Sequence, residues 1–291
     1  MQKSPISKIA LDGRDFYVKR DDLIDPFLAG NKYRKLYTLL KTPKEKYNKI
    51  ISYGGTQSNA MLAIAAMCKE KEWEFTYYTK PLSTLQKEQN EGNFFHAISL
   101  GMRHVEIEEA YYKEYIASLR IHLDEKTYII DQGGADASAK EGLEVLAREI
   151  REANLNLKAL ATPSGTGTTA LFLALALPEY KIYTTPCVGD SVYLKEQMNA
   201  LYAIPKNLII LEPAKKYHFA KLYPEFLEIY KKILSSGVEF DLLYAPNLWK
   251  VLLEQTSEEI LYIHSGGVSG NASMLKRYKK KVESQKTVKT K

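Results

Sequence analysis

Residues 49–71 read KIISYGGTQSNAMLAIAAMCKEK, and their pattern indicates the fold class. Its first five residues are rich in isoleucine and predict a β-strand over 49–53, because branched side chains favour extended backbone. The alanine-rich part predicts a helix over 57–71. Two glycines separate the two elements and allow a tight turn. The stretch therefore predicts a strand–turn–helix unit.

The same unit recurs along the chain. Further strands are predicted over 73–79, 127–131, 157–161, 181–185, 207–211, 241–243 and 260–264. Helical patterns over 33–40, 136–152 and 168–177 lie between them. Strands that alternate with helices predict an α/β protein with parallel sheets built from right-handed crossovers. Asp12-Gly13, within the alternating segment 9–21, predicts one antiparallel hairpin.

Loops that follow the strands are the expected place for chemistry, because open parallel sheets bind ligands beyond the carboxyl ends of their strands. Residues 163–169 read PSGTGTT and open a helix. Glycine lets backbone N–H groups converge, and a helix start carries partial positive charge, so this loop suits an anion. It lacks the Gly-Lys-Ser/Thr ending of a nucleotide P-loop. A plain turn capped by threonine is the alternative.

Three more loops have unusual compositions. In the loop over 53–59, the donors Gln57, Ser58 and Asn59 stand at one helix start and suit a carboxylate, although a simple capped turn would use the same residues. The loop over 264–267 reads HSGG. In the loop over 29–32, Lys32 follows Gly30-Asn31 at the start of a helix, whereas most lysines are surface charges.

These segments carry a family resemblance. VKRDDL at 18–23 and AGNKYRKL at 29–36 resemble the paired signature of the 1-aminocyclopropane-1-carboxylate (ACC) deaminase / D-cysteine desulfhydrase family. GGTQSN at 54–59, the loop at 164–169 and IHSGG at 263–267 are similar to further family motifs, in the same order. The family comprises pyridoxal-phosphate (PLP) enzymes of the tryptophan-synthase-β-like fold, type II. The resemblance runs from about Tyr17 to Gly270.

The resemblance implies two open, twisted, mostly parallel sheets in two domains. Residues 1–32 and 132–275 would form the larger, cofactor-binding domain, and residues 33–131 the smaller one. Residues 276–291 would form a flexible basic tail. Family members are usually homodimers, so the resemblance also implies a second copy as partner, besides a small amino acid as substrate.

The resemblance further implies roles for individual residues. Lys32 matches the lysine that forms the Schiff base with PLP, and Asn59 the residue that bonds the cofactor's phenolic oxygen. Gln57 and Ser58, with Asn59, would hold the substrate carboxylate, and Ser58 would also act beside the reacting carbon. Ser265 would face the pyridine nitrogen, and a neutral hydroxyl there favours prompt loss of a leaving group. The phosphate would be held by Ser164, Gly165, Thr166, Gly167, Thr168 and Thr169.

Departures from the family pattern bear on the reaction. Alignment on Lys250 places Asn247 at a family tyrosine and Leu248 at the deaminase glutamate. Phe219 stands at a second family tyrosine, and Tyr217 or Tyr244 could substitute for the missing phenols. Because ring opening needs more acid–base help than elimination does, the expected reaction is desulfhydration of D-cysteine. ACC deamination and a PLP-binding protein without catalysis are the alternatives.

Composition excludes several other classes. The net charge is +6, but eight basic residues and one acid follow position 275, so the rest of the chain carries −1. Such a tail predicts a solvated, frayed end rather than a nucleic-acid-binding face. No apolar run approaches a membrane span, and the first residues lack a signal-peptide core. Cys68 and Cys187 have no close partners, so neither a disulfide scaffold nor a metal site is expected. We expect a cytoplasmic protein.

Overall fold

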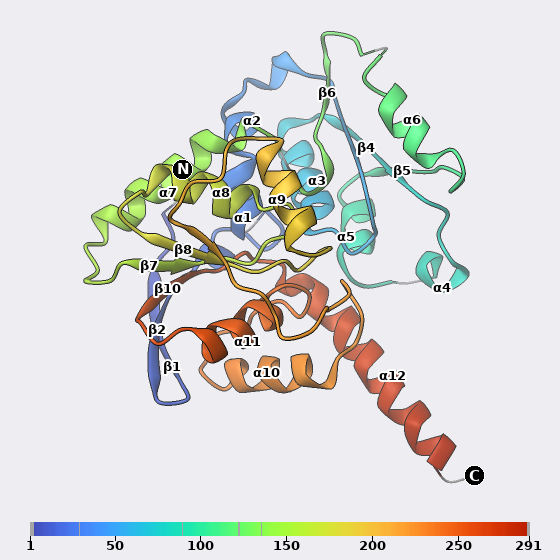
Figure 1. The fold of residues 1–291 in the computed structure, drawn as a ribbon. Coiled ribbons are helices and arrows are strands. Elements are labelled where there is room, and N and C mark those ends of the chain that lie inside the picture. The colour runs from blue at the N-terminus through green and yellow to red at the C-terminus, as the bar shows by residue number, and fades with distance from the viewer. Residues whose placement is uncertain (1–2, 29, 89, 122, 135, 290–291) are drawn as a thin grey trace.

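Two sheets make up the framework of the protein (Figure 1). The computed structural model describes residues 3–28, 30–88, 90–121, 123–134 and 136–289. The larger sheet has the order β1-β2-β10-β7-β8-β9, and the smaller one β5-β4-β3-β6. The strands are β1 Ile6–Leu11, β2 Arg14–Lys19, β3 Lys49–Tyr53, β4 Glu74–Thr79, β5 Arg103–Glu106, β6 Thr127–Ile129, β7 Ala159–Ala161, β8 Lys181–Thr184, β9 Leu208–Ile210 and β10 Ile260–Ile263.

All strand pairs except β1–β2 are parallel, which confirms the predicted α/β class with mostly parallel sheets. The helices are α1 Gly30–Lys35, α2 Tyr37–Lys41, α3 Asn59–Lys71, α4 Thr84–Lys87, α5 Asn93–Ser99, α6 Tyr112–Ser118, α7 Ala139–Glu152, α8 Thr168–Ala176, α9 Ser191–Asn199, α10 Pro224–Leu234, α11 Ala245–Gln255 and α12 Asn271–Lys289. Single turns of 3₁₀ helix occur at η1 Asp21–Leu23, η2 Lys44–Lys46, η3 Gln132–Gly134 and η4 Val268–Gly270.

Helices cover both faces of the larger sheet, so its central strand β10 is buried on both sides. Successive side chains of a strand point to opposite faces. Leu261 and Ile263 therefore enter the core shared with α7 and α8. Ile260 and Tyr262 enter the core shared with α10 and α11. In the smaller sheet, α3 and α5 supply the main covering core, which includes Ile50 of β3.

The predicted hairpin is confirmed. Leu11 of β1 pairs with Arg14 of β2, and the two residues between them, Asp12 and Gly13, have φ angles of 52° and 74°. Both values lie in the left-handed region that a two-residue hairpin turn requires, and Asp-Gly is among the sequences that tolerate it best.

The predicted strand over 241–243 is wrong. Asp241 accepts hydrogen bonds on Oδ1 from the N–H groups of Leu243 (3.0 Å) and Tyr244 (2.6 Å), and Asn271 accepts one from Leu242 (2.9 Å). Side chains thus take the donors that a neighbouring strand would need, and the chain turns directly into α11. Strand β5 was not predicted from the sequence, because RHVE at 103–106 has no clear alternation.

Helix α12 occupies the segment predicted to be frayed and extends away from the rest of the protein (Figure 1). Its own residues Met274 and Tyr278 are buried against the rest of the protein. Arg277 and Lys281 donate to the backbone oxygens of Ala220 and Leu222, at 2.9 Å each. The basic segment is therefore anchored over its first two turns. The predicted flexibility and domain boundaries remain predictions.

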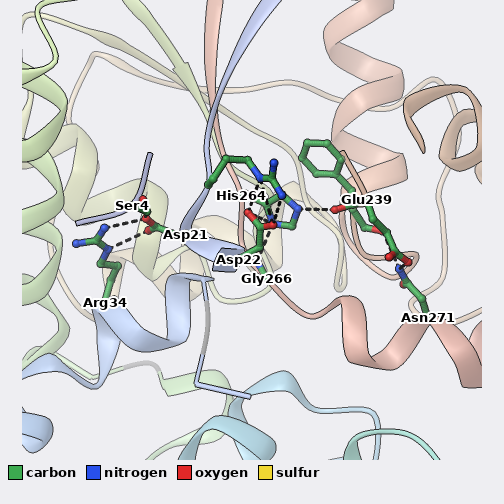
Figure 2. Close-up of polar contacts among 10 residues, drawn as sticks. Ser4, Asp21, Asp22, Arg34, Glu239, His264, Gly266 and Asn271 are labelled. Atoms are coloured by element: carbon green, nitrogen blue, oxygen red, sulfur yellow. Dashed lines mark hydrogen bonds and ion pairs between the residues drawn. The ribbon is translucent and has the colours of Figure 1, made fainter. Parts of the chain in front are cut away.

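A buried ion-pair network fixes helix α1 (Figure 2 shows its Asp21–Arg34 part). The Arg34 side chain is 0% exposed and donates to Asp21 from Nε (2.9 Å) and Nη2 (2.7 Å). It also donates to Glu149 of α7, at 2.6 Å and 2.9 Å. Lys19 of β2 completes the network with an ion pair to Glu149 (2.8 Å). Helix α1 is thereby tied directly to η1 and α7, and through Glu149 to β2.

Within the described ranges, no helix combines the length and the apolar character that crossing a bilayer requires.

Candidate active site

The predicted site residues come together around one cavity of about 730 Å³. The cavity lies where β3, β7, β8 and β10 end, since residues following each of these strands line it. This is the edge at which parallel sheets bind ligands. The lining includes all predicted site residues: Lys32, Gln57, Ser58, Asn59, Ser164, Gly165, Thr166, Gly167, Thr168, Thr169 and Ser265.

Lys32 contributes a primary amine to the lining of this cavity. Burial lowers its pKa from the usual 10.5 to about 8, and the negative charge of Asp241 partly opposes this. Asp241 is itself 1% exposed, and burial raises its pKa to about 6 against the N–H groups it accepts from. Its Oδ2 atom has no hydrogen-bond partner among the described residues. A neutral, nucleophilic amine is therefore accessible near physiological pH.

Lys35 is a second cavity lysine that the sequence analysis did not single out. It lies one helical turn after Lys32 and is 6% exposed. Its Nζ donates to the backbone oxygen of Gly133 (3.1 Å). Burial and the nearby charge of Lys32 lower its pKa well below the usual value. The spacing of three residues could have indicated it, because such residues share a helix face.

The start of α3 presents oriented donors. Ser58 caps the helix and accepts from the N–H of Met61 (3.2 Å). Asn59 accepts on Oδ1 from Nδ2 of Asn93 (2.7 Å), so its own amide nitrogen is left to donate elsewhere. Gln57 likewise accepts on Oε1 from Ser273 (3.3 Å). Asn93, far away in sequence, thus sets the orientation of the Asn59 amide, which no local sequence pattern indicates.

Ser164 has a different position from the rest of its loop. Its N–H donates to the backbone oxygen of Thr185 (3.2 Å). Its hydroxyl lies 2.6 Å from that of Thr184, which donates its own hydrogen to Thr162 (2.7 Å). Because the Thr184 hydrogen is already used, Ser164 must be the donor of that pair. Ser164 therefore anchors the loop, and the expected donors to an anion are the residues that follow it.

These following residues keep donors available at the start of α8. The hydroxyls of Thr166 and Thr168 are 2.9 Å apart. Thr169 accepts from Nδ2 of Asn31 (3.3 Å), which leaves its hydroxyl hydrogen free for another acceptor. The first N–H groups of α8 also have no acceptor within the helix. Since Asn31 precedes Lys32, the same bond ties the lysine helix to this loop.

Tyr244 places a phenol in the cavity next to the anion loop. Its ring lies beside the anion loop, because a Cβ atom on Gly165 would stand 3.4 Å from Tyr244 Cε1. Burial raises the pKa of Tyr244, with further contributions from Asp241 and Cys187. The phenol is therefore protonated at neutral pH.

The alignment on Lys250 is corrected accordingly. Asn247 and Leu248 are 2% and 0% exposed, and neither lines the cavity. Counting from Asp241 instead places Tyr244 at the family tyrosine, three residues later, and Ala245 at the position of the glutamate. Phe219 does line the cavity and packs against Tyr244, with ring centroids 5.2 Å apart.

Tyr217 can be excluded as a substitute phenol. It donates to Glu225 (3.2 Å) and packs against Tyr223 and Phe226, outside the cavity lining. Tyr53, which the sequence analysis did not consider, lines the cavity and donates to Asp131 (2.7 Å). Asp131 also forms an ion pair with Arg120, so this carboxylate is already engaged.

Known proteins resemble this chain along most of its length. A family model described as "Pyridoxal-phosphate dependent enzyme" matches residues 2–201. A putative 1-aminocyclopropane-1-carboxylate deaminase of Thermotoga maritima is 28% identical, over 89% of this chain and 90% of the relative. A D-cysteine desulfhydrase of Serratia proteamaculans is 26% identical, over 88% of this chain and 87% of the relative.

A plant relative and a solved structure extend these matches. The bifunctional D-cysteine desulfhydrase/1-aminocyclopropane-1-carboxylate deaminase of Arabidopsis thaliana, a mitochondrial protein, is 25% identical over 89% of this chain and 74% of its own. The crystal structure of an ACC deaminase homologue superposes with a TM-score of 0.74 at 21% identity, covering 95% of this chain and 94% of that one. That likeness shows the type II fold. The chain belongs to the family of pyridoxal-phosphate-dependent enzymes, and its cofactor is pyridoxal 5'-phosphate.

Proposed function

We propose that the protein is a lyase that removes hydrogen sulfide and ammonia from D-cysteine. The observation that carries this proposal is the joint presence, around one cavity, of the buried Lys32 amine, the threonine-rich start of α8 and the donors at the start of α3. The first suits an aldehyde, the second a phosphate and the third a carboxylate. Curated relatives named for D-cysteine and for ACC support an amino-acid substrate.

The residues present fit the cofactor. Lys32 would hold it through the amine, whose lowered pKa permits condensation. Thr166, Thr168 and Thr169 would hold the phosphate, together with the free N–H groups of α8. Lys35 Nζ would add a hydrogen-bond donor near this loop, because the turn around Gly133 is close to both Lys35 and Thr166.

Two more groups would contact the cofactor ring. The Asn59 amide nitrogen, left to donate because its oxygen accepts from Asn93, would donate to the phenolic oxygen of the cofactor. Ser265 lines the cavity, and no described residue engages its hydroxyl, which would face the ring nitrogen. When bound, pyridoxal phosphate withdraws electrons from the α-carbon of an attached amino acid. A hydroxyl partner leaves that withdrawal weaker than a carboxylate partner would, which favours elimination over slower reactions.

The chain's own groups then bind the substrate and move its protons. Gln57 and Ser58 would orient the substrate carboxylate at the start of α3, where the helix dipole also favours negative charge. Lys32 Nζ, once released, would take the proton from the α-carbon, since a pKa of about 8 suits a general base near neutrality. The Tyr244 hydroxyl, protonated at neutral pH, would donate to the departing sulfur.

The scarcity of free carboxylates in the cavity favours elimination over opening of the ACC ring. Among the described residues of its lining, the only acid is Asp131, and Tyr53 and Arg120 already engage it. Ala245 stands where the deaminase has a glutamate. A ring-opening reaction would lack that additional acid–base group.

A product assay tests the proposal. The purified, cofactor-loaded protein is incubated separately with D-cysteine, L-cysteine and ACC. D-Cysteine and water should give pyruvate, ammonia and hydrogen sulfide in equal amounts, whereas ACC should give little 2-oxobutyrate. Faster formation of 2-oxobutyrate and ammonia from ACC would instead establish the deaminase, the second candidate, which the names of several relatives favour. Absence of products from all three would leave only cofactor binding.

We further propose that the enzyme acts as a cytoplasmic homodimer. The dimer is supported by the resemblance, because family members are usually homodimers. The two buried, unpaired cysteines, Cys68 and Cys187, are compatible with a reducing compartment such as the cytoplasm. Light scattering coupled to size-exclusion chromatography and cell fractionation test the two statements separately.

A further inference from the structure

His264 directly precedes Ser265 of the cavity lining but does not line the cavity itself. Figure 2 shows it with its partners Glu239 and Gly266. His264 follows β10, is 0% exposed, and its ring stacks on Phe240 with centroids 4.4 Å apart and planes at 16°. The next residue is Ser265, which the proposed function places at the cofactor ring. Because the ring is completely buried, both of its nitrogens need partners within the protein.

Each ring nitrogen has a backbone partner with a fixed role. The N–H of Gly266 donates to Nδ1 (3.0 Å), so Nδ1 must carry a lone pair. Nε2 lies 2.8 Å from the backbone oxygen of Glu239, which can only accept, so Nε2 must carry the hydrogen. These two bonds together permit only the neutral ring with its hydrogen on Nε2. A second proton on Nδ1 would point at the Gly266 N–H and break that bond.

The surrounding charges are compatible with a neutral ring. Burial has the largest effect on the pKa of His264 and lowers it. Arg20 lowers it further, while Asp22, the bond to the Glu239 backbone oxygen and Asp21 raise it. Asp22 Oδ1 stands 3.8 Å from Nδ1, but Arg20 binds this carboxylate at 2.7–3.2 Å and offsets its charge. On the other side, the Glu239 carboxylate accepts from Tyr230 and Asn271 rather than from the imidazole.

The loop that His264 holds makes two very close contacts. A Cβ atom on Gly30 would stand 2.1 Å from the backbone carbon and oxygen of Ser265. A Cβ atom on Gly267 would stand 2.2 Å from the Asn59 amide nitrogen. The loop therefore abuts the start of α1, two residues before Lys32, and the start of α3. A displacement of Gly266 would be transmitted to both.

We propose that His264 is a positioning residue that, as the neutral Nε2–H form, sets Ser265 and Asn59 relative to Lys32 through the N–H of Gly266. This inference rests on the proposed function, since it takes the cavity as the cofactor site. It adds a role to a histidine that touches neither cofactor nor substrate. The stacking on Phe240 and the bond to Glu239 fix the ring, and the bond to Gly266 transmits its position.

Two substitutions of His264 test its bonds to Gly266 and Glu239 one at a time. In His264→Asn, the side-chain oxygen can replace Nδ1 as acceptor for Gly266. In His264→Gln, the longer amide can replace Nε2 as donor to Glu239 but leaves the Gly266 N–H unpaired. We expect the asparagine variant to keep the absorbance and circular dichroism of the bound cofactor, and the glutamine variant to change both and bind pyridoxal phosphate about tenfold more weakly or worse. His104→Gln, in β5 of the smaller sheet, is the matched control.

Equal spectra and affinities for the two variants would overturn the proposal. If both variants fail to fold, the wild-type holoenzyme still decides: isotope-labelled histidine should show one ring that stays neutral with its hydrogen on Nε2 between about pH 5.5 and 8.5. Titration of His264 within that range would also overturn it. A wild-type protein that binds no pyridoxal phosphate at Lys32 would refute the proposed function instead, whatever the variants do.

Discussion

Helix α1 presents two regions with opposite electrostatics. On one side, Arg34 is fully buried and bonded to Asp21 and Glu149, and these carboxylates raise its pKa against the opposing effect of burial. On the other side, Lys32 and Lys35 line the cavity without an ion-pair partner among the described residues, and burial lowers the pKa of both. The same short helix therefore holds one arginine with two ion-pair partners and two lysines without such partners in the described part of the chain.

This difference distinguishes residues that fix the geometry of the site from residues that take part in its chemistry. A buried charge with matched partners fixes geometry, and removing one partner is costly because the other stays behind unpaired. A buried amine without a partner exists partly in its neutral form, which is the reactive one. Arg34 thus positions α1, whereas Lys32 performs the proposed chemistry. The predictions below test this separation.

Lys32→Ala should have the largest effect. It removes the only group proposed to attach the cofactor, so the visible absorbance of bound pyridoxal phosphate and all turnover should disappear while the fold is kept. Absorbance spectroscopy and borohydride reduction followed by peptide mapping measure this. Lys41→Ala, which removes an exposed lysine paired with Glu141, is the control and should behave as wild type. A borohydride label on any other lysine would refute the assignment.

Arg34→Met should chiefly affect stability. Asp21 and Glu149 would each lose a buried partner, so the free energy of unfolding should fall by about 3–5 kcal/mol. Denaturant titration of the variant measures this. Arg151→Met, which removes an exposed arginine paired with Glu179, should cost less than about 1 kcal/mol. Equal losses for the two variants would mean that burial of the network contributes nothing.

The pH dependence of cofactor binding should reveal the lowered pKa of Lys32. Because only the neutral amine reacts, the rate at which cofactor-stripped protein captures pyridoxal phosphate should rise as pH passes about 8, the pKa of Lys32, rather than near 10.5. Asp241→Asn keeps an acceptor for the N–H groups of Leu243 and Tyr244 but removes the charge that raises this pKa. The inflection should therefore move to lower pH. An unchanged inflection would show that Asp241 does not act on Lys32.

Thr168→Ala should have the smallest effect. It removes one hydroxyl at the start of α8 and no buried charge, so the fold should be unaffected. Affinity for pyridoxal phosphate should fall by about 1–3 kcal/mol if this hydroxyl contacts the phosphate. Equilibrium dialysis gives the value, and Thr168→Ser should retain most of the affinity. Unaltered binding in the alanine variant would place the phosphate elsewhere.

Much of the site could be predicted because its residues lie in short local motifs. Gly54–Asn59 and Ser164–Thr169 each follow a strand and open a helix, so their sequence alone indicated donors at a helix start. Residues that act across the fold could not be predicted in this way. Asn93 orients Asn59 from 34 positions away. The correct phenol, Tyr244, also needed the structure, because alignment on Lys250 gave the wrong register.

The α/β class, the hairpin at Asp12-Gly13, the family resemblance and the residues around the cavity could all be inferred from the amino-acid sequence. These depend on local backbone preferences and on motifs read along the chain. Among the described residues, three features depend on contacts made across the fold: Ser164 anchors its loop, Arg34 is ion-paired while Lys32 is not, and His264 lies between Glu239 and Gly266. Burial and partners set the state of a polar group, and both arise from segments that meet only when the chain folds.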